Sequence, residues 1–556
     1  MKKNIIILGV ATVMMLFNSC KASWLEQYPE GSTITEGQFV EMEGALEGSV
    51  MGIYSLMYAF GGDHDTFGQR SIDMYGDFTC GDMAMSTQNY GWFATDDMGQ
   101  SYTRRAYFWS YYYDMIRLCN KSLNAFNAQV DPEKLEDEAY IMEYSSMFYY
   151  YAEIIALRGW AYSNLQKWFC YTPSYLAEQG MDPASYKSIP LYTEEVTVAD
   201  TILGNPLSTV VDVYQRIEDD LKTAIYYFDI LESNGVNRAI KQEMNGDVAR
   251  LTLAYNYLNA EDWAKAAATA EEFINNTKTN LLPREELTTT GFADINSNNW
   301  VWGQDVNVMT TTSLASFFGQ CDIFSYSYAW AGDIKGIDAN LLATITDEHE
   351  WDARALWFNN TYNTCNEKTT QYAPDGKFYS PSVKAKVGYG RKAKDQELDR
   401  DWLSDNVFMR CELGYLIAAE ANARMEELSK AAEYLTAITD QRIIEGQESA
   451  YDTWKGTLSD KETLLAEIKY NWRVELWGEG FGMSDIMRLH KPVVRYNAST
   501  KEYPAAFRFN VEYGDPYMLL RFPQQEMDNN SALVDNTGGA QPSAGQNPTL
   551  KDGVTD

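Results

Sequence analysis

Histidine and cysteine, the side chains that most often bind zinc, are scarce in this sequence. The 556 residues contain three histidines and seven cysteines, and no two cysteines form a Cys-x-x-Cys pair. A zinc site needs such ligands at close and regular spacing, so we expect none here. The spacing indicates no disulfides either, and we expect buried free thiols at six positions. These are Cys80, Cys119, Cys170, Cys321, Cys365 and Cys411.

Motifs of common catalytic sites are missing as well. The sequence has no Gly-x-Ser-x-Gly, no His-Glu-x-x-His and no Walker A motif. The charged cluster at 347–350 is followed by Asp352 and Arg354, which indicates a solvated helix start. We therefore expect neither enzymatic activity nor a cofactor. A glycosidase carboxylate pair has no recognisable sequence spacing, so a glycan hydrolase stays open as an alternative.

Positive charge is in short supply. Lysine and arginine total 45 against 79 aspartates and glutamates, which gives a formal net charge of −34. Such a surface repels phosphate backbones, so nucleic acid is excluded as an expected partner. Acidic polysaccharides are disfavoured for the same reason. Aromatic residues, in contrast, make up 14% of the chain, which is more than packing alone requires.

Long apolar runs are confined to the N-terminus. Lys2 and Lys3 precede the apolar run 5–17, whose length suits a signal peptide and is too short to span a bilayer. The sequence Leu-Phe-Asn-Ser-Cys that ends at Cys20 resembles a lipobox, in which the cysteine thiol receives a diacylglycerol. We predict a lipoprotein signal peptide at 1–19 and a tether at 20–40. The alternative is an ordinary signal peptide cleaved near Ala22.

The apolar spacing predicts helical hairpins. Val248, Leu251 and Leu258 lie at helical intervals, and a polar turn at 259–262 follows. Trp263 then begins a second apolar stripe, and the turn with this helix is similar to a tetratricopeptide repeat. We predict an all-α fold of stacked hairpins, because each hairpin leaves an apolar face that a neighbour must cover. The predicted hairpins lie near 105–126, 144–168, 246–276 and 413–443.

Long segments without helical period separate the hairpins. They cover 61–102, 288–336 and 361–405 and are rich in glycine, asparagine, serine and aromatic residues. Loops of this length in a compact domain are usually functional. We expect them to lie away from the stacking faces and to form a ligand-binding face.

One spacing is compatible with calcium. Asp294, Asn296, Asn298 and Asp305 fall at positions 1, 3, 5 and 12 of an EF-hand-like loop. However, position 6 is Asn299 rather than glycine, and position 12 lacks the usual glutamate. We therefore expect an asparagine-rich turn without a metal.

The segment Asn471–Leu489, NWRVELWGEGFGMSDIMRL, predicts a helix, a glycine stop and a second helix whose charges could pair. It resembles the "RR-x-EL-x-x-EGHRWFDL-x-R" block of SusD/RagB-type surface lipoproteins, with Phe481 and Gly482 in place of His-Arg. Further segments are similar to blocks of that family in the same order. They are Ala45–Leu56, Leu157–Tyr162, Asn256–Ala267, Tyr415–Ala432 and Leu519–Met527.

The resemblance implies capture of a ligand rather than chemistry. It implies one SusD-like helical domain over 41–556, anchored through Cys20 on the outside of the outer membrane. Such a protein binds oligosaccharides and passes them to a SusC-like TonB-dependent transporter. Sugar rings stack on aromatic faces, while polar side chains bind the hydroxyls. The candidate ligand-binding residues are Trp330, Trp302, Trp92, Trp300, Tyr326, Tyr328, Tyr90, Arg70, Asp77 and Asn89.

Several alternatives stay open at this point. For each tryptophan the alternative role is core packing beneath a long loop. For the whole protein the alternatives are peptide capture by the same fold, the glycan hydrolase, and a transporter lid without affinity of its own.

Overall fold

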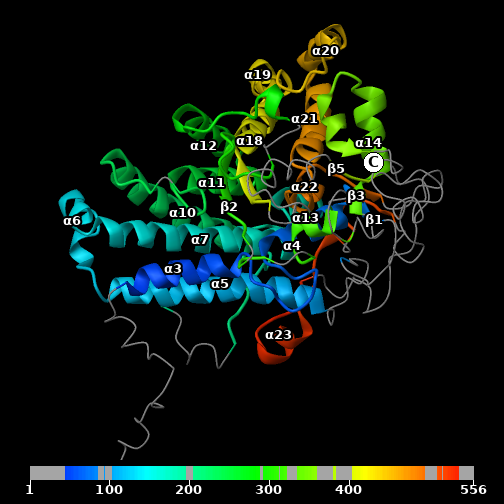
Figure 1. Cartoon of the computed structure of the whole chain (residues 1–556). Helices are drawn as coiled ribbons and strands as arrows, with labels where there is room; N and C mark the ends of the chain where they lie inside the picture. The colour runs from blue at the N-terminus through cyan, green and yellow to red at the C-terminus, as the bar shows by residue number, and fades with distance from the viewer. Residues whose placement is uncertain are drawn as a thin grey trace, which may run out of the picture.

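The computed structural model is built mainly of α-helices (Figure 1), which confirms the predicted fold class. It describes residues 44–85, 93, 103–195, 204–238, 240–287, 292–307, 309–311, 314–321, 328, 335–359, 380–382, 404–494, 510–515 and 518–536. Within these ranges, no helix has both the length and the apolar character that crossing a membrane would require.

The helices fall into long and short elements. The long ones are α3 (Ala45–Leu56), α4 (Gln69–Cys80), α5 (Thr103–Asn127), α7 (Ser145–Phe169), α10 (Val210–Ser233), α11 (Gly246–Asn259), α12 (Trp263–Asn276), α18 (Cys411–Arg424), α19 (Leu428–Thr439), α20 (Glu448–Lys455), α21 (Lys461–Glu475) and α22 (Gly482–Arg488). The short ones are α6 (Glu138–Glu143), α8 (Pro173–Glu178), α13 (Phe317–Cys321), α14 (Ala339–Ala343) and α23 (Gln524–Asn529). Helical turns of other types are η3 (Pro132–Lys134), η4 (Arg284–Glu286), η5 (Thr344–Glu348), η6 (Ala353–Trp357) and η9 (Gly456–Ser459).

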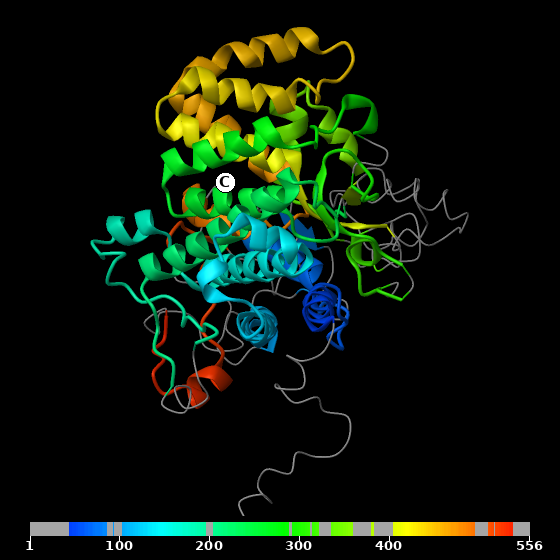
Figure 2. The same ribbon diagram turned by 90° about the vertical axis from the view of Figure 1, so that its left-hand side faces the viewer.

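Long helices pack in chain order to form a layered stack. Helix α5 packs on α7, α7 on α10, α10 on α11, α11 on α12, and α12 on α18. Helix α18 then contacts both α19 and α21. Figure 2 shows the layers from the blue and cyan helices of the N-terminal part to the yellow and orange helices near residue 450. Each helix therefore buries its apolar face against the next one, as the hairpin pattern predicted.

Two hairpins share the same turn. Helix α11 is joined to α12, and α18 to α19, through a glutamate with positive φ: 61° at Glu261 and 69° at Glu426. The amide of Asp262 donates to the carbonyl oxygen of Tyr257, and the amide of Glu427 donates to that of Asn422, both at 2.9 Å. In both turns the hydrogen bond joins residues that are five positions apart and has the same length. The hairpins predicted at 246–276 and 413–443 are therefore copies of one repeat unit.

The other two predicted hairpins were wrong. Residues 105–126 lie within the single helix α5, and residues 144–168 lie almost entirely within α7. Neither segment contains a proline or a turn dipeptide that would stop the helix. The apolar positions were read correctly as helical, but the two segments are partners of one another, because α5 packs against α7.

One hydrophobic cluster extends from Leu46 to Leu533 and joins the layers. Close approach of helices is possible where side chains are small. A Cβ atom at Gly414 of α18 would lie 2.6 Å from Cδ1 of Phe273 in α12, so a side chain there would push these helices apart.

Four antiparallel strand pairs in the described chain connect segments that are distant in sequence. They are β1 (Met83–Met85) with β3 (Lys335–Ile337), β2 (Trp300–Gln304) with β6 (Asn406–Arg410), β4 (Phe358–Asn359) with β5 (Ser380–Ser382), and β7 (Val493–Val494) with β8 (Asn510–Val511). In Figure 1 β1, β3 and β5 lie on the side of the stack where α13 and α14 are found.

The described cysteines are buried. Cys80, Cys119, Cys170 and Cys411 are free thiols, as predicted, and Cys321 is also buried. Burial raises the pKa of Cys119, Cys170 and Cys411 to about 12, so these thiols stay protonated at neutral pH. Cys365 lies outside the described residues.

The segment Asn471–Leu489 forms the end of α21, a glycine turn and α22, and its charges are buried as expected. Both carboxylate oxygens of Glu475 accept hydrogen bonds from arginines: Arg410 Nη1 at 3.0 Å, and Arg442 Nε and Nη2, each at 3.0 Å. Arg354 Nη1 adds a fourth contact at 3.2 Å. Burial by itself raises the pKa of Glu475, but the charges of Arg442, Arg410 and Arg354 outweigh it and hold that pKa far below its usual value.

Two charges of this segment pair with partners outside it, Glu479 with Arg410 and Arg473 with Asp82, whereas Asp485 pairs within it, with Arg488. The predicted solvated charges at 347–350 are exposed at Asp347, Glu348 and Glu350. The prediction was wrong for Asp352 and Arg354, which are fully buried and form an ion pair that extends to Glu475.

We expect Glu475→Gln to lower the free energy of unfolding by about 3–5 kcal/mol, because the change leaves three buried guanidinium groups without their shared carboxylate. Urea denaturation followed by circular dichroism measures this loss. Glu462→Gln, at an exposed position of the same helix, is the matched control and should change stability by less than ~0.5 kcal/mol. Equal stability of the two variants would contradict the structural role of Glu475.

Candidate ligand-binding face

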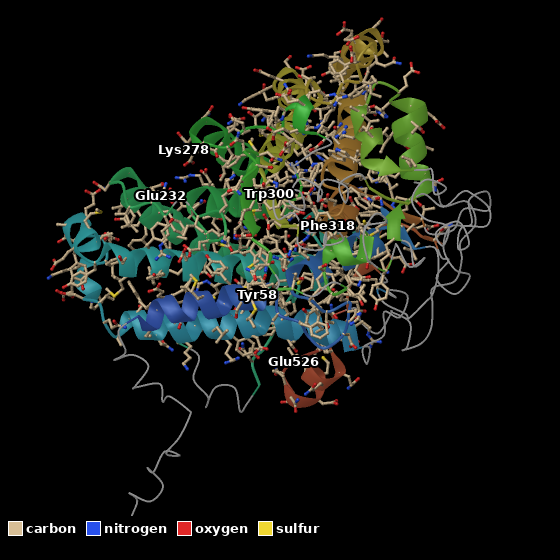
Figure 3. All side chains as sticks on the ribbon, in the orientation of Figure 1. Tyr58, Glu232, Lys278, Trp300, Phe318 and Glu526 are labelled. Carbon is tan, nitrogen blue, oxygen red and sulfur yellow. The ribbon has the colours of Figure 1, made fainter. Side chains whose placement is uncertain are left out.

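Two of the predicted stacking residues are core residues. Trp300 and Trp302 belong to β2 and have no exposed surface. The Trp302 ring lies 5.2 Å from that of Trp160 and 5.0 Å from that of Phe408 (centroid distances), and its indole nitrogen donates to the carbonyl oxygen of Gln242 at 3.2 Å. Figure 3 shows Trp300 in the middle of the molecule. Since protein covers both rings, they support the fold and offer no face to a sugar.

Arg70 and Asp77, two predicted polar contacts, are buried on α4. Arg70 donates to Asp73 at 3.1 Å and to the carbonyl oxygen of Gly478 at 2.7 Å, and its guanidinium lies 4.5 Å from the ring centroid of Phe317. Burial raises the pKa of Asp77 well above its usual value, and the neighbouring Asp82 adds to this. These side chains fasten α4 to the glycine turn after α21, so they are not available to ligand hydroxyls.

Glycine is required in that turn. Gly478 and Gly480 have φ of 79° and 82°, which disfavours other residues. A Cβ atom at Gly480 would lie 2.4 Å from Oδ1 of Asp73. The two glycines that interrupt the helical pattern therefore allow α4 to pack directly on the turn.

The remaining predicted ligand residues lie outside the described residues. They are Trp330, Trp92, Tyr326, Tyr90 and Asn89, and the predicted lipid-attachment residue Cys20 lies outside as well. Their roles stay predictions.

The structure brings together residues from two of the predicted ligand loops, 61–102 and 288–336. Phe93 of the first loop is buried against Tyr75 and Phe78, with ring centroids 4.9 and 5.6 Å away. Tyr328, a predicted ligand-binding residue of the second loop, is buried as well, and its amide donates to the carbonyl oxygen of Gly319 at 2.9 Å. The ammonium group of Lys335 lies 6.0 Å from the Phe93 centroid and 5.2 Å from the Tyr328 centroid. Loops more than 200 residues apart in sequence therefore meet at one point.

The α3–α4 loop (residues 57–68) reaches the same point. His64 Nδ1 and the Tyr328 hydroxyl form a hydrogen bond of 2.5 Å, and Gln320 Nε2 donates to the carbonyl oxygen of His64 at 2.9 Å. The sequence analysis did not single out His64. It lies in the predicted loop segment 61–102, next to the turn signal Gly61-Gly62, but no pattern in the sequence distinguished it from its neighbours.

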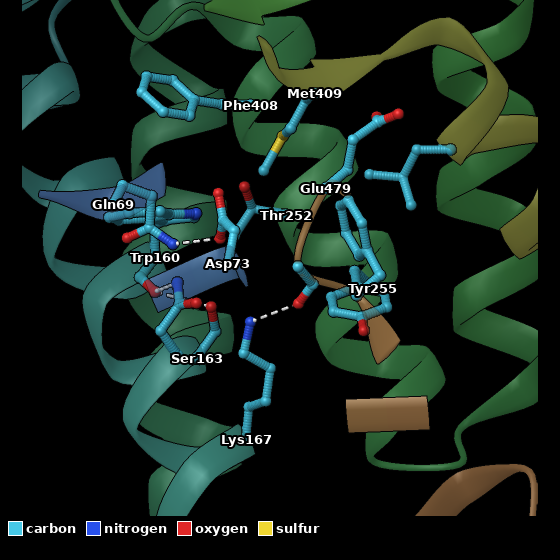
Figure 4. Close-up of a pocket in the computed structure, with 14 residues that line it drawn as sticks. Gln69, Asp73, Trp160, Ser163, Lys167, Thr252, Tyr255, Phe408, Met409 and Glu479 are labelled. Atoms are coloured by element: carbon cyan, nitrogen blue, oxygen red, sulfur yellow. Dashed lines mark hydrogen bonds between the residues drawn. The ribbon is translucent and has the colours of Figure 1, made fainter. Parts of the chain in front are cut away.

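A small cavity lies between α4, α7, α11 and the glycine turn (Figure 4). Its volume is ≈ 40 Å³, and Trp160, Tyr255, Asp73 and Lys167 are among the residues that line it. Lys167 Nζ donates to the carbonyl oxygen of Gly480 at 3.2 Å, a contact drawn in the figure. One water needs about 10–15 Å³ by this measure, so the cavity accepts a few waters and is too small for a sugar ring.

Burial shifts the titration of the charged groups around this cavity. It lowers the pKa of Lys167, an effect that Asp73 and Asp485 oppose, and it raises the pKa of Asp73. Burial raises the pKa of Asp485 to about 6, against the opposing charge of Arg488. Asp485 therefore titrates in the mildly acidic range.

The asparagine-rich segment after residue 293 is a hydrogen-bonded turn. Asp294 Oδ1 accepts from the amide of Asn296 at 2.9 Å and from its side chain at 2.8 Å. Among the residues that the structure describes, no group of three or more His, Cys, Asp or Glu side chains is arranged to hold a metal ion.

Comparisons with known proteins identify the family and the fold. The model of a family described as "Starch-binding associating with outer membrane" matches residues 23–253, and that of the SusD family matches residues 326–538. The chain belongs to the SusD/RagB family. A SusD-like protein of Bacteroides ovatus is 26% identical over 255 residues, which are 45% of this chain and 39% of that relative.

Solved structures share the fold at lower identity. A SusD-like carbohydrate-binding protein from Bacteroides vulgatus has a TM-score of 0.66 at 19% identity, over 88% of this chain and 97% of the other. A SusD superfamily protein from Bacteroides thetaiotaomicron also has a TM-score of 0.66, at 18% identity, over 88% and 98%. Surface glycan-binding protein A from Bacteroides thetaiotaomicron, solved with laminarihexaose, has a TM-score of 0.59 at 14% identity, over 89% and 99%.

We expect Trp302→Ala to lower the free energy of unfolding by about 3–5 kcal/mol, because it opens a cavity between Trp160 and Phe408. Urea denaturation measures the change. Any ligand affinity of the folded fraction should stay within about twofold of the wild-type value. A loss of affinity at unchanged stability would instead return Trp302 to the ligand-binding face.

The raised pKa of Asp485 predicts a pH-dependent stability term. The folded protein holds this proton up to about pH 6, whereas the ordinary pKa of an aspartate side chain is 3.8. The contribution is therefore fully present well below pH 3.8 and is lost as the pH rises through about 6. We expect the wild-type free energy of unfolding to fall relative to Asp485→Asn by about 2–2.5 kcal/mol between pH 4 and pH 7. Parallel stability–pH curves in urea denaturation would contradict the shift.

Proposed function

We propose that this protein is a surface glycan-binding lipoprotein that captures oligosaccharides and passes them to a SusC-like TonB-dependent transporter. The observation that carries the proposal is the meeting of the two aromatic-rich loops at Lys335, between Phe93 and Tyr328. Trp330 and Tyr326 are each two residues from Tyr328 along the chain, and Trp92 precedes Phe93. We assign aromatic side chains of both loops, Trp92 and Trp330 among them, to one ligand face.

Sugar chemistry supports this assignment. The C–H faces of pyranose rings are apolar and stack on aromatic rings, while a few polar groups fix the orientation. The family description names starch binding, and a structural relative binds laminarihexaose, so carbohydrate is the favoured ligand class. The negative net charge favours neutral over acidic glycans.

The N-terminal sequence and the family support the proposed anchor and the proposed partner. Lipidation of Cys20 with several acyl chains would anchor the protein stably in the membrane, whereas a single acyl chain gives only marginal membrane binding. The family description includes association with the outer membrane. A lipid-anchored binding protein at that membrane requires a transporter to move its ligand inward, which is the role we assign to the TonB-dependent partner.

Binding without catalysis fits the charges of the Asn471–Leu489 segment. Glu475 and Glu479 are bound to arginines in the interior, and Asp485 is bound to Arg488. Carboxylates held in this way stabilise the scaffold and are inaccessible to a glycosidic bond.

The first experiment is a binding screen with the chain from Lys21 onward. Affinity gel electrophoresis and calorimetry would use neutral plant, host and fungal polysaccharides, with glucose hexasaccharides of α-1,4, β-1,4 and β-1,3 linkage. We expect one glycan class to bind. Trp330→Ala or Trp92→Ala should weaken binding at least ~10-fold, which is about 1.4 kcal/mol. Trp263→Ala, on the scaffold helix α12, is the control and should bind like the wild type.

Other outcomes would select the alternatives. Binding of peptides but not glycans would identify a peptide-capturing member of the family. Release of reducing ends from a bound glycan would identify a hydrolase. Absence of binding until the transporter is added would identify a lid.

A further inference from the structure

The α3–α4 loop holds an apolar ring in solvent by means of its own hydrogen bonds. Phe60 is 50% exposed, whereas Phe67, with which it forms an isolated antiparallel β-bridge, is buried. The amide of Gly61 donates to the carbonyl oxygen of Thr66 at 2.6 Å, and the amide of Asp63 donates to Thr66 Oγ1 at 3.1 Å. These hydrogen bonds close the loop upon itself and fix the backbone next to the exposed ring.

The base of the loop is equally constrained. The amide of Gln69 donates to the carbonyl oxygen of Met57 at 2.9 Å, which joins the two ends. Gly68 has φ of 76°, and a Cβ atom there would lie 2.1 Å from that same oxygen. The half-exposed Phe60 ring on this support leaves apolar surface in water that contact with a ligand would bury.

Polar groups stand beside the ring at distances that suit a ligand. The Phe60 and His64 ring centroids are 6.1 Å apart at an interplanar angle of 53°, and the His64 and Tyr328 centroids are 5.7 Å apart. The hydrogen bond between His64 and Tyr328 fixes the imidazole, and Gln320 fixes its backbone. An exposed apolar ring next to an imidazole held in one orientation is a combination that suits the C–H face and a hydroxyl of a sugar.

We infer that the α3–α4 loop forms a sugar subsite of the ligand-binding face, in which Phe60 is the stacking surface for a neutral pyranose. This inference rests on the proposed glycan-binding function. It extends the ligand-binding face to the α3–α4 loop, whose His64 is bonded to Tyr328. His64 is a positioning residue that ties this loop to the second ligand loop.

The test uses the chain from Lys21 onward and the neutral glycan that the wild type binds in the screen. We expect Phe60→Ala to weaken binding about 5- to 10-fold with an unchanged urea midpoint, because the ring is exposed. Phe60→Trp should retain at least the wild-type affinity. Tyr226→Ala removes an aromatic ring of similar exposure (42%) from the scaffold helix α10 and should have no effect.

Tyr328→Phe tests the positioning role. It deletes the hydroxyl that holds His64 and should weaken binding about threefold, while the double variant with Phe60→Ala should be no weaker than Phe60→Ala alone by more than twofold. Wild-type affinity of Phe60→Ala, with binding still lost in Trp330→Ala, would overturn the subsite and leave the proposed function intact. Absence of glycan binding by the wild type would overturn both.

Discussion

The arrangement of this protein depends on the ion pairs that the carboxylate of Glu475 forms with three arginines. Arg354, Arg410 and Arg442 reach it from three separate segments of the chain, and all four side chains are fully buried. Removing so many charges from water is costly, and only their mutual contacts offset that cost. The network therefore fixes the end of α21 relative to three segments. Arg354 belongs to η6, Arg410 to β6, and Arg442 lies just after α19.

From this fixed point the contacts extend to the ligand-binding face. The turn that follows Glu475 receives the guanidinium of Arg70, and the glycine at 480 lets α4 approach. Helix α4 is preceded by the α3–α4 loop, whose His64 contacts Tyr328. The ion network thus lies at one end of a short chain of packed elements, and the converging loops lie at the other. A rigid support of this kind keeps a binding face pre-organised, which lowers the entropy cost of capturing a flexible glycan.

The hairpins at 246–276 and 413–443 could be predicted because a helix of 3.6 residues per turn repeats its apolar positions along the chain, and a polar turn interrupts them. The same pattern could not show whether two adjacent stripes belong to one helix or to two partners, which explains the errors at α5 and α7. The site was harder to predict. Tryptophan is equally at home in a core and on a binding face, and nothing in the sequence separates Trp302, which is buried, from an exposed aromatic residue such as Phe60.

The sequence by itself determined the helical class, the repeat turn, the family and the burial of charge in the segment after Asn471. These are local or compositional properties, and each is set by residues within one or two turns of helix. Only the tertiary structure decided which arginines meet Glu475, which aromatic rings are covered and which loops converge at Lys335. Those outcomes depend on contacts between residues far apart in the chain, and the spacing of residues along a sequence carries no direct record of distance in space.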